Sequence, residues 1–290
     1  MKKTSILILG SNGLLGNTIF KYIYLKKIHK VFGSVRNKKN INFKNSLVTG
    51  NIFKNNKLNI DKIIYFVKKN KIKFIINCLG VTKHRSFKTL KRQSYHLNSK
   101  INFEIIKNCK NSKLVILSSD CVFDGKKGNY DEKIKPNAID IYGKSKAAGE
   151  IINNKKVITL RTSTIGHEIK TKFGLLEWFL KQKQNVNGFN KAFFSGPTSL
   201  ELSKIINNFI LTGKIKSGIY HISAKKISKY DLLKIISIIY NKKIKINKDN
   251  NFFIDRSLNS HKFRKKFNYK FPSWKIMIKD LKQFNEQQIF

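Results

Sequence analysis

Cysteine is scarce in this sequence of 290 residues, and long apolar runs are absent from it. The three cysteines, Cys78, Cys109 and Cys121, form no C-x-x-C pair. An odd number with this spacing predicts neither a disulfide framework nor a zinc site, and we expect no metal site. No stretch approaches the roughly 20 apolar residues that a membrane-spanning helix needs. These features predict a soluble protein of a reducing cytoplasm, with no membrane partner.

The first residues, MKKTSILILGSNG, superficially resemble a signal peptide. Their apolar run is too short for the hydrophobic region of such a peptide, and no small-residue cleavage site follows it. We therefore expect this segment to belong to the folded protein.

Acidic residues and arginine are also scarce. The chain has 16 Asp and Glu against 60 Lys and Arg, a formal net charge of +44, yet only six of the basic residues are arginine. Such a charge suggests nucleic acid or an acidic membrane as partner. The lysines are spread along every segment, however, whereas a DNA-binding protein usually clusters its charge and uses arginine at base edges. Because Lys, Asn and Ile are all abundant and have A- and T-rich codons, we attribute the lysine excess to genomic base composition and expect no nucleic-acid partner.

Short apolar runs alternate with longer amphipathic segments through the first half of the chain. Runs rich in Val, Ile and Leu without polar alternation are typical of buried strands in a parallel sheet. They occur at residues 5–10, 30–35, 46–50, 73–80, 113–119 and 156–162, and segments of helical length occur at 13–27, 58–70, about 90–111 and 141–154. This alternation predicts an α/β fold with a doubly wound parallel sheet.

The pattern becomes irregular after about residue 165. Helices are expected at 172–184, 198–212, 228–241 and 273–286, with short strands near 217–222 and 243–247. We predict two domains, a dinucleotide-binding domain at 1–165 and a smaller α/β substrate lobe at 166–290, with the lobe packed on the carboxyl edge of the sheet.

The first expected strand runs into a glycine-rich turn, LILGSNGLLGNTIF, which opens the first expected helix. Glycines at such a junction permit a tight turn, let backbone N–H groups approach a pyrophosphate and let the helix pack close to the sheet. An ordinary strand-to-helix turn is the alternative. Its place at the first junction of an alternating chain favours dinucleotide binding by Gly10, Asn12, Gly13, Leu14, Leu15 and Gly16.

The second strand ends in VFGSVRN, which offers Ser34 and Arg36 and no carboxylate. An acidic residue at this position takes the ribose hydroxyls of NAD, whereas a basic residue accommodates the 2′-phosphate of NADP. We therefore favour NADPH as cofactor, with NADH as the alternative. The alternative is that Arg36 is a solvated loop residue that contacts no cofactor.

Tyr142 and Lys146 in IDIYGKSKAAGE are four residues apart and share one face of the expected helix. A tyrosine with its ordinary pKa of about 10 exchanges protons poorly near neutral pH unless a cation stabilises the phenolate. At about 4 Å and an effective dielectric constant of about 20, the attraction is about 4 kcal/mol, or about three pKa units. We therefore predict that Lys146 lowers the pKa of Tyr142, although the pair could occur by chance in so lysine-rich a chain.

A hydroxyl precedes this pair, because the strand at 113–119 ends in Ser118 and Ser119. Sheets of this kind carry their chemistry at the carboxyl ends of their strands. A hydroxyl, a phenol and a lysine that face a nicotinamide would form a carbonyl-reducing site. Ser119 would bond the substrate oxygen, Tyr142 would deliver the proton, and Lys146 would hold the ribose.

With these motifs the chain resembles the extended short-chain dehydrogenase/reductases, and within them the dTDP-4-dehydrorhamnose reductase-like sugar-nucleotide reductases. The resemblance rests on GSNGLLG, INCLG, SSDCVFDG, YGKSK, LRTSTIG, GPTSLELSKII and GIYHISA. It implies a Rossmann fold with a C-terminal sugar-nucleotide lobe and makes Ser119, Tyr142 and Lys146 catalytic. It also implies that Asn77, Cys78, Leu79 and Gly80 lie along the cofactor, and that Val122, Phe123, Arg161 and Arg256 lie near the substrate.

The resemblance also separates subclasses. SSDCVFDG is most similar to the STDYVFDG of the reductases, whereas related dehydratases resemble TDEVYG and epimerases SSATVYG. Ser119 stands where the reductases have Thr, and Cys121 stands where they have Tyr and leaves less bulk beside the sugar. The segment TGNIF contains Asn51 and Ile52, and we place both residues along the cofactor. Asn51 stands where relatives have an Asp near the adenine.

The sequence therefore predicts an NAD(P)H-dependent reductase of a 4-keto-6-deoxy nucleotide sugar, serving surface polysaccharide synthesis. Its partner would be the nucleotide-sugar substrate, and a homodimer is compatible with the resemblance. A non-catalytic regulatory subunit that keeps the fold and the cofactor site is the alternative from a different class.

Overall fold

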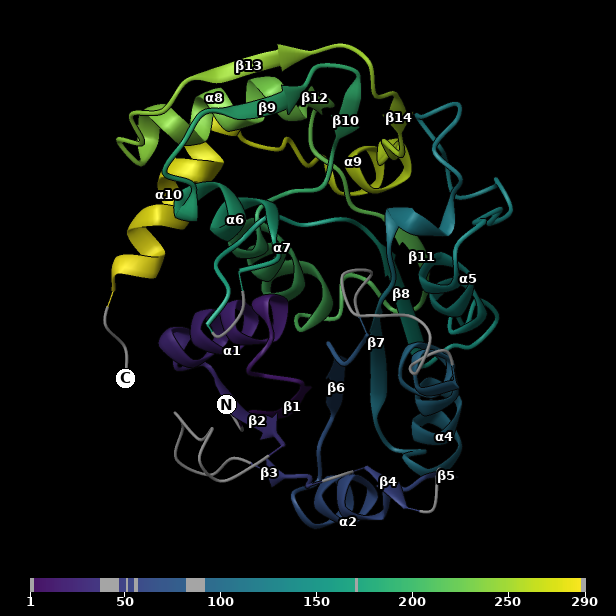
Figure 1. Ribbon diagram of the computed structural model, residues 1–290. Coiled ribbons are helices and arrows are strands. Elements are labelled where there is room, and N and C mark those ends of the chain that lie inside the picture. Colours follow the sequence, from purple (N-terminus) through teal and green to yellow (C-terminus); the bar gives the residue numbers. More distant parts are fainter. Residues whose placement is uncertain are drawn as a thin grey trace.

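The computed structural model describes residues 3–36, 47–50, 52–54, 57–81, 92–169 and 172–287. A seven-stranded sheet in the order β11-β8-β7-β6-β1-β2-β3 forms its centre, and every neighbouring pair is parallel (Figure 1). The strands are β1 (Thr4–Leu9), β2 (His29–Val35), β3 (Leu47–Val48), β6 (Phe74–Asn77), β7 (Lys113–Leu117), β8 (Val157–Arg161) and β11 (Gly218–His221). The predicted α/β fold with a doubly wound parallel sheet is confirmed.

The sheet changes direction of growth between β1 and β6. From β1 the chain moves outward to β2 and β3, and it then returns to β6 on the other side and continues to β7, β8 and β11. Loops after neighbouring strands diverge at such a switch point, and ligands bind in the crevice that this leaves. The glycine-rich turn after β1 and the INCLG segment, which ends β6 and continues to Gly80, flank this point.

Both faces of the sheet are covered because successive side chains of a strand point to opposite faces. In β1 all of Ile6, Leu7, Ile8 and Leu9 are fully buried. Ile6 and Ile8 join the core under α1 (Leu14–Lys26), whereas Leu7 and Leu9 join the core under α2 (Asp61–Lys69) and α4 (Ile101–Asn108). A run without polar alternation therefore becomes a strand that is buried on both faces.

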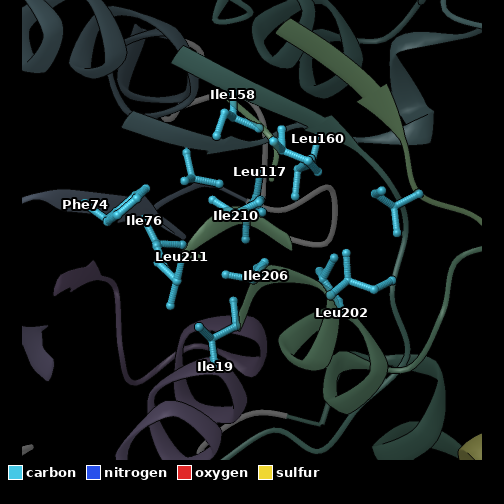
Figure 2. Close-up of a cluster of buried hydrophobic side chains, with 14 of the residues drawn as sticks. Ile19, Phe74, Ile76, Leu117, Ile158, Leu160, Leu202, Ile206, Ile210 and Leu211 are labelled. Carbon is cyan, nitrogen blue, oxygen red and sulfur yellow. The ribbon is translucent and has the colours of Figure 1, made fainter. Parts of the chain in front are cut away.

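Three later segments complete the α1 face: α7 (Ser199–Ile205), the π-helical turn Ile206–Ile210 and α9 (His261–Phe267). Figure 2 shows Ile19 of α1 and Ile206 and Ile210 of the turn directed toward side chains of the sheet. Burial of one such aliphatic side chain stabilises the fold by about 1.5 to 3 kcal/mol. The sheet therefore depends for one of its layers on residues that follow position 165.

The C-terminal lobe lies beyond the end of the sheet (Figure 1). Its helices are α6 (Leu175–Lys181), α8 (Lys229–Ile239) and α10 (Trp274–Glu286), and its strands are β9 (Val186–Phe189), β10 (Ala192–Phe194), β12 (Ile227–Ser228), β13 (Ile246–Asp249) and β14 (Ile254–Asp255). They form the sheets β12-β10-β14 and β13-β9 over a separate apolar core. Because β11, α7 and α9 belong to the main sheet and its cover, the division at residue 165 stays a prediction.

Hydroxyl side chains start three helices of the later half. Thr198, Ser228 and Ser273 accept hydrogen bonds from the backbone N–H three residues on, at α7, α8 and α10. A side-chain oxygen at this position satisfies a backbone donor that has no partner within the helix, and such a cap is worth about 1 kcal/mol.

The remaining elements are a short hairpin, β4 (Phe53–Lys54) and β5 (Lys57–Leu58), and the segment around α5 (Ile141–Ala148) that carries the predicted site. A 3-10 turn, Asp120–Val122, follows β7, and a π-helical turn, His96–Lys100, precedes α4. Among the described residues, no helix has both the length and the apolar character needed to cross a membrane.

Candidate active site

The glycine-rich turn after β1 has a backbone that only glycine fits at two positions. Gly10 has φ +77°, and its N–H donates to the Ser34 Oγ at 3.0 Å. A Cβ on Gly16 would lie 2.2 Å from the Gly10 carbonyl oxygen. In contrast, a Cβ on Gly13 would meet only the Gly10 oxygen, at 3.4 Å, so this face of the turn is open.

Helix α1 begins directly after this turn, at Leu14. The N–H groups of its first turn have no carbonyl partner within the helix, and together with the helix dipole they form an anion-binding site. Gly13 is exposed, and Asn12, Leu14 and Leu15 are half-buried around it. The turn therefore has the open backbone that a pyrophosphate needs, and its contact with a dinucleotide stays a prediction.

Ser34 lies in β2, below the glycine-rich turn. Its side chain is buried, its Oγ accepts the Gly10 N–H, and its carbonyl accepts from the Ser11 N–H and the Ser11 Oγ. A Cβ on Gly33 would lie 2.6 Å from the Ser11 Oγ, so the strand and the turn are in close contact. These bonds give Ser34 a role in shaping the turn, and a contact with a 2′-phosphate stays a prediction.

Arg36 follows the last residue of β2 and is exposed. Its carbonyl accepts the Gly50 N–H at 3.0 Å, which links it to the segment after β3. Ile52, predicted along the cofactor, is half-buried against the α2 side of the core. Asn51 lies outside the described residues, so its predicted place near the adenine stays a prediction.

Tyr142 and Ser119 lie together because α5 packs tightly on the loop after β7. Asp140 caps α5 by accepting the Gly143 N–H at 2.8 Å. A Cβ on Gly143 would lie 2.0 Å from the carbonyl oxygen of Cys121, so only glycine permits this approach. The contact brings the phenol of Tyr142 into a hydrogen bond with the Ser119 hydroxyl.

Burial raises the pKa of Tyr142 above its ordinary value. The neighbouring Cys121 acts in the same direction, the hydrogen bond with Ser119 opposes it, and Asp120 and Asp140 add to the increase. The prediction that Lys146 lowers this pKa is wrong for the arrangement in the structure. The phenol is therefore held protonated, which is the form that a proton donor needs.

Lys146 is directed toward the ends of two strands. Its Nζ donates to the carbonyl of Leu117, the last residue of β7, at 2.8 Å. A Cβ on Gly80 would lie 3.6 Å from the same Nζ, so the loop after β6 passes beside it. Burial lowers the pKa of Lys146 to about 8, although of its two titratable neighbours, Cys78 and Glu150, the carboxylate favours the charged form.

The loop after β6 connects the glycine-rich turn with Lys146. The Cys78 N–H donates to the Leu9 carbonyl, and the Leu79 N–H donates to the Asn77 Oδ1 at 3.0 Å. Burial raises the pKa of the Cys78 thiol to about 12, so the thiol stays neutral. Asn77, Cys78, Leu79 and Gly80 are thus brought together beside both predicted cofactor contacts.

Sequence reasoning missed a pair of buried asparagines that hold this loop. Asn98, in the π-helical turn, accepts the Val81 N–H at 3.1 Å and donates to the Ser145 Oγ of α5 at 2.9 Å. Asn102 accepts from the Asn77 Nδ2 at 2.7 Å. The available signal was the spacing of four residues, which puts two amides on one face of a helix that also buries Ile101 and Ile105.

The predicted substrate residues lie mostly behind the site. Val122 and Phe123 are fully buried, and Phe123 stacks on Tyr130 with ring centroids 4.2 Å apart. Arg161 is 1% exposed and bonds both oxygens of Glu150, at 2.9 and 2.8 Å. These side chains support the wall of the site, so a direct substrate contact by them stays a prediction.

Arg256 connects the C-terminal lobe to the loop after β7. Its Nε donates to the Phe123 carbonyl at 2.9 Å, and its Nη2 lies 3.9 Å from the Asp140 Oδ2. Because Asp140 caps α5, Arg256 lies one contact away from the helix that carries Tyr142. Within the described residues, no three His, Cys, Asp or Glu side chains are grouped so that they could hold a metal ion.

Known proteins match both the sequence and the fold. A dTDP-4-dehydrorhamnose reductase of Aggregatibacter actinomycetemcomitans is 34% identical over 131 residues, 42% of this chain and 45% of that protein. The methionine adenosyltransferase 2 subunit beta of Danio rerio is 26% identical over 145 residues, 50% of this chain and 42% of that protein. The matches thus span less than half the length of either curated relative.

A solved structure agrees over nearly the whole chain. The dTDP-4-dehydrorhamnose reductase of Bacillus anthracis, in complex with NADP, superposes with a TM-score of 0.79 at 22% identity and covers 98% of this chain and 99% of its own. This likeness supports the doubly wound fold. The sequence model of the RmlD substrate binding domain matches residues 4–284, and the chain therefore belongs to the RmlD substrate binding domain family.

Proposed function

We propose that this protein is an oxidoreductase that uses NADPH to reduce the keto group of a 4-keto-6-deoxy nucleotide sugar. The observation that carries the proposal is the contact of the Ser119 hydroxyl with the Tyr142 phenol, beside Lys146, at the carboxyl end of β7. The 34% identity to a dTDP-4-dehydrorhamnose reductase supports the substrate class. The NADP held by the Bacillus anthracis reductase supports the cofactor.

The residues of the first turn fit a dinucleotide. The open face of Gly13 and the first N–H groups of α1 would receive the pyrophosphate, and the exposed Arg36 would pair with the 2′-phosphate. Lys146 would hold the nicotinamide ribose from the opposite side, next to Gly80. When bound, the nicotinamide supplies the hydride that the protein itself lacks.

Ser119 and Tyr142 divide the remaining work. The Ser119 hydroxyl, which lies 3.1 Å from the Asp120 Oδ1, would turn to donate to the substrate carbonyl oxygen and fix its position. The Tyr142 phenol, held protonated by its raised pKa, would deliver its proton to the developing alkoxide.

Incubation with NADPH and a set of 4-keto-6-deoxy nucleotide sugars tests the proposal. We expect the nicotinamide absorbance to fall and an equal amount of reduced sugar nucleotide to form. Tight cofactor binding without turnover of any such substrate would contradict it. We further propose that the product serves surface polysaccharide synthesis, so deletion of the gene should remove a deoxysugar from that polymer.

The match to the methionine adenosyltransferase 2 subunit beta favours a second candidate, a non-catalytic subunit that binds a partner enzyme. This candidate requires the fold and the cofactor site but no proton donor. It predicts that Tyr142→Phe leaves cellular function intact, whereas the reductase requires the phenol.

A homodimer stays a prediction, and sedimentation equilibrium would test it.

A further inference from the structure

A buried ion pair lies directly beneath the proposed active site. The Glu150 carboxylate, in a side chain only 3% exposed, accepts two hydrogen bonds from Arg161, to Oε1 at 2.9 Å and to Oε2 at 2.8 Å. Its Oε1 also accepts the hydroxyl of Ser118 at 2.6 Å. A carboxylate with three such bonds is fixed in position, because each donor restricts its rotation.

These bonds connect the elements that carry the proposed catalytic groups. Ser118 immediately precedes Ser119 after β7, and Arg161 is the last residue of β8. Glu150 follows the end of α5 and is four residues from Lys146. β7 and β8 are already paired in the sheet, and the one carboxylate links the end of α5 to the ends of both strands at the level of Ser119 and Lys146.

The charges around the pair leave Glu150 as a counterion for two cations. His221 contacts the Arg161 Nη1 at 3.3 Å and is neutral, since burial and Arg161 lower its pKa to about 3. Glu132 is used elsewhere, where it accepts the backbone N–H of His221 at 2.8 Å. Arg161 also lies over the ring of Phe123, 5.2 Å from its centroid.

We propose that Glu150 is a positioning residue. It fixes the position of Ser119 relative to Lys146, and it supplies the negative charge that balances Arg161 and Lys146. The proposal rests on the proposed function, since it concerns the same site. In this proposal Arg161 is the ion-pair partner that helps to hold Glu150 in position.

Glu150→Gln tests the charge. The amide has nearly the same shape and can still accept the Ser118 hydroxyl, but it removes the negative charge that favours the ammonium of Lys146. The titratable groups that act on Lys146 are Cys78 and Glu150, and Cys78 is neutral. Loss of the carboxylate therefore lowers the pKa of Lys146 further below about 8.

The readout is the pH dependence of NADPH binding, followed by nicotinamide fluorescence, and of kcat. In the wild type, both should decline as the pH rises through about 8, where Lys146 loses its proton. In Glu150→Gln this decline should move to lower pH by roughly one unit. Glu177→Gln, which removes a carboxylate from the 2.6 Å pair with His167 in the C-terminal lobe, is the matched control and should leave the decline in place.

Glu150→Asp keeps the charge but shortens the side chain, so it cannot bond Arg161 and Ser118 together. We expect kcat to fall at least tenfold while the alkaline decline stays near the wild-type pH. If Glu150→Gln does not fold, this variant alone decides. A folded Gln variant with an unchanged decline, or an Asp variant with wild-type kcat, would overturn the proposal. The fluorescence arm needs no sugar substrate, so failure of the proposed reaction is distinguishable from failure of this inference.

Discussion

Individual side chains carry the proposed chemistry, and Tyr142 can be tested most directly. Tyr142→Phe keeps the ring and its packing but removes the hydroxyl that would protonate the alkoxide. We expect kcat to fall by roughly 10² to 10⁴ fold, the usual contribution of a general acid. NADPH affinity, measured by fluorescence, should change little. A Phe variant with near-normal kcat on a verified substrate would remove Tyr142 from the mechanism.

The proposed preference for NADPH can be tested at a single side chain, Arg36. Arg36 is exposed just after β2. The hydroxyl of Ser34, two residues earlier, already accepts a hydrogen bond from Gly10 of the glycine-rich turn. Arg36→Ala would leave a 2′-phosphate without its cation, so NADPH affinity should fall at least tenfold while NADH affinity stays within about twofold. Titration of both cofactors checks this, with the distant Arg264→Ala as control. Equal losses for both would contradict the NADPH assignment.

At the scale of single elements, α5 depends on one glycine. In Gly143→Ala the new Cβ would lie 2.0 Å from the Cys121 carbonyl oxygen and 2.5 Å from the Ala138 Cβ. The helix must move away from the loop after β7, at a typical cost of about 1 to 3 kcal/mol in the free energy of unfolding. Ser119 and Tyr142 would separate, so kcat should fall by more than tenfold.

Lys144→Ala is the control for this prediction, because Lys144 is exposed on the same helix. Its Tm and kcat should both stay close to wild type. A Gly143→Ala protein with unchanged Tm and kcat would show that α5 does not need this close contact. Thermal unfolding and steady-state rates together distinguish the two outcomes.

Single elements also differ in how well the sequence predicts their place in the fold. The runs that became β1, β6, β7 and β8 were recognisable because their apolar residues do not alternate with polar ones. The place of β11 in the sheet could not be recognised in this way. Nothing in the local sequence GIYH indicates that this strand pairs with β8 and not with a strand of the C-terminal lobe. Pairing between distant segments depends on tertiary contacts.

Buried polar residues were the harder part of the site. The spacing of Tyr142 and Lys146 predicted a shared helix face correctly, but the direction of the Tyr142 pKa depends on burial, which the sequence does not contain. Arg161 was placed near the substrate by its motif, whereas its bonds to Glu150 turn it toward the interior. A charged residue in a motif does not reveal which of its neighbours in space will pair with it.

At the scale of the whole molecule, the net charge of +44 makes a prediction about nucleic acid. Evenly spread lysines attract the phosphate backbone of DNA but give no base readout, which depends on placed side chains in a groove. Binding of a fluorescent duplex should therefore be weak, independent of sequence and steeply reduced by salt, because it depends on counterion release.

Fluorescence anisotropy between 50 and 200 mM salt checks this, and a loss of roughly 10³ fold or more is expected over that range for a protein with several phosphate contacts. Added duplex should leave NADPH affinity unchanged at the higher salt, since binding that depends on counterion release is largely lost there. Tight, sequence-dependent binding that persists at 200 mM salt would mean that part of the lysine excess serves recognition, and the attribution to base composition would then be wrong.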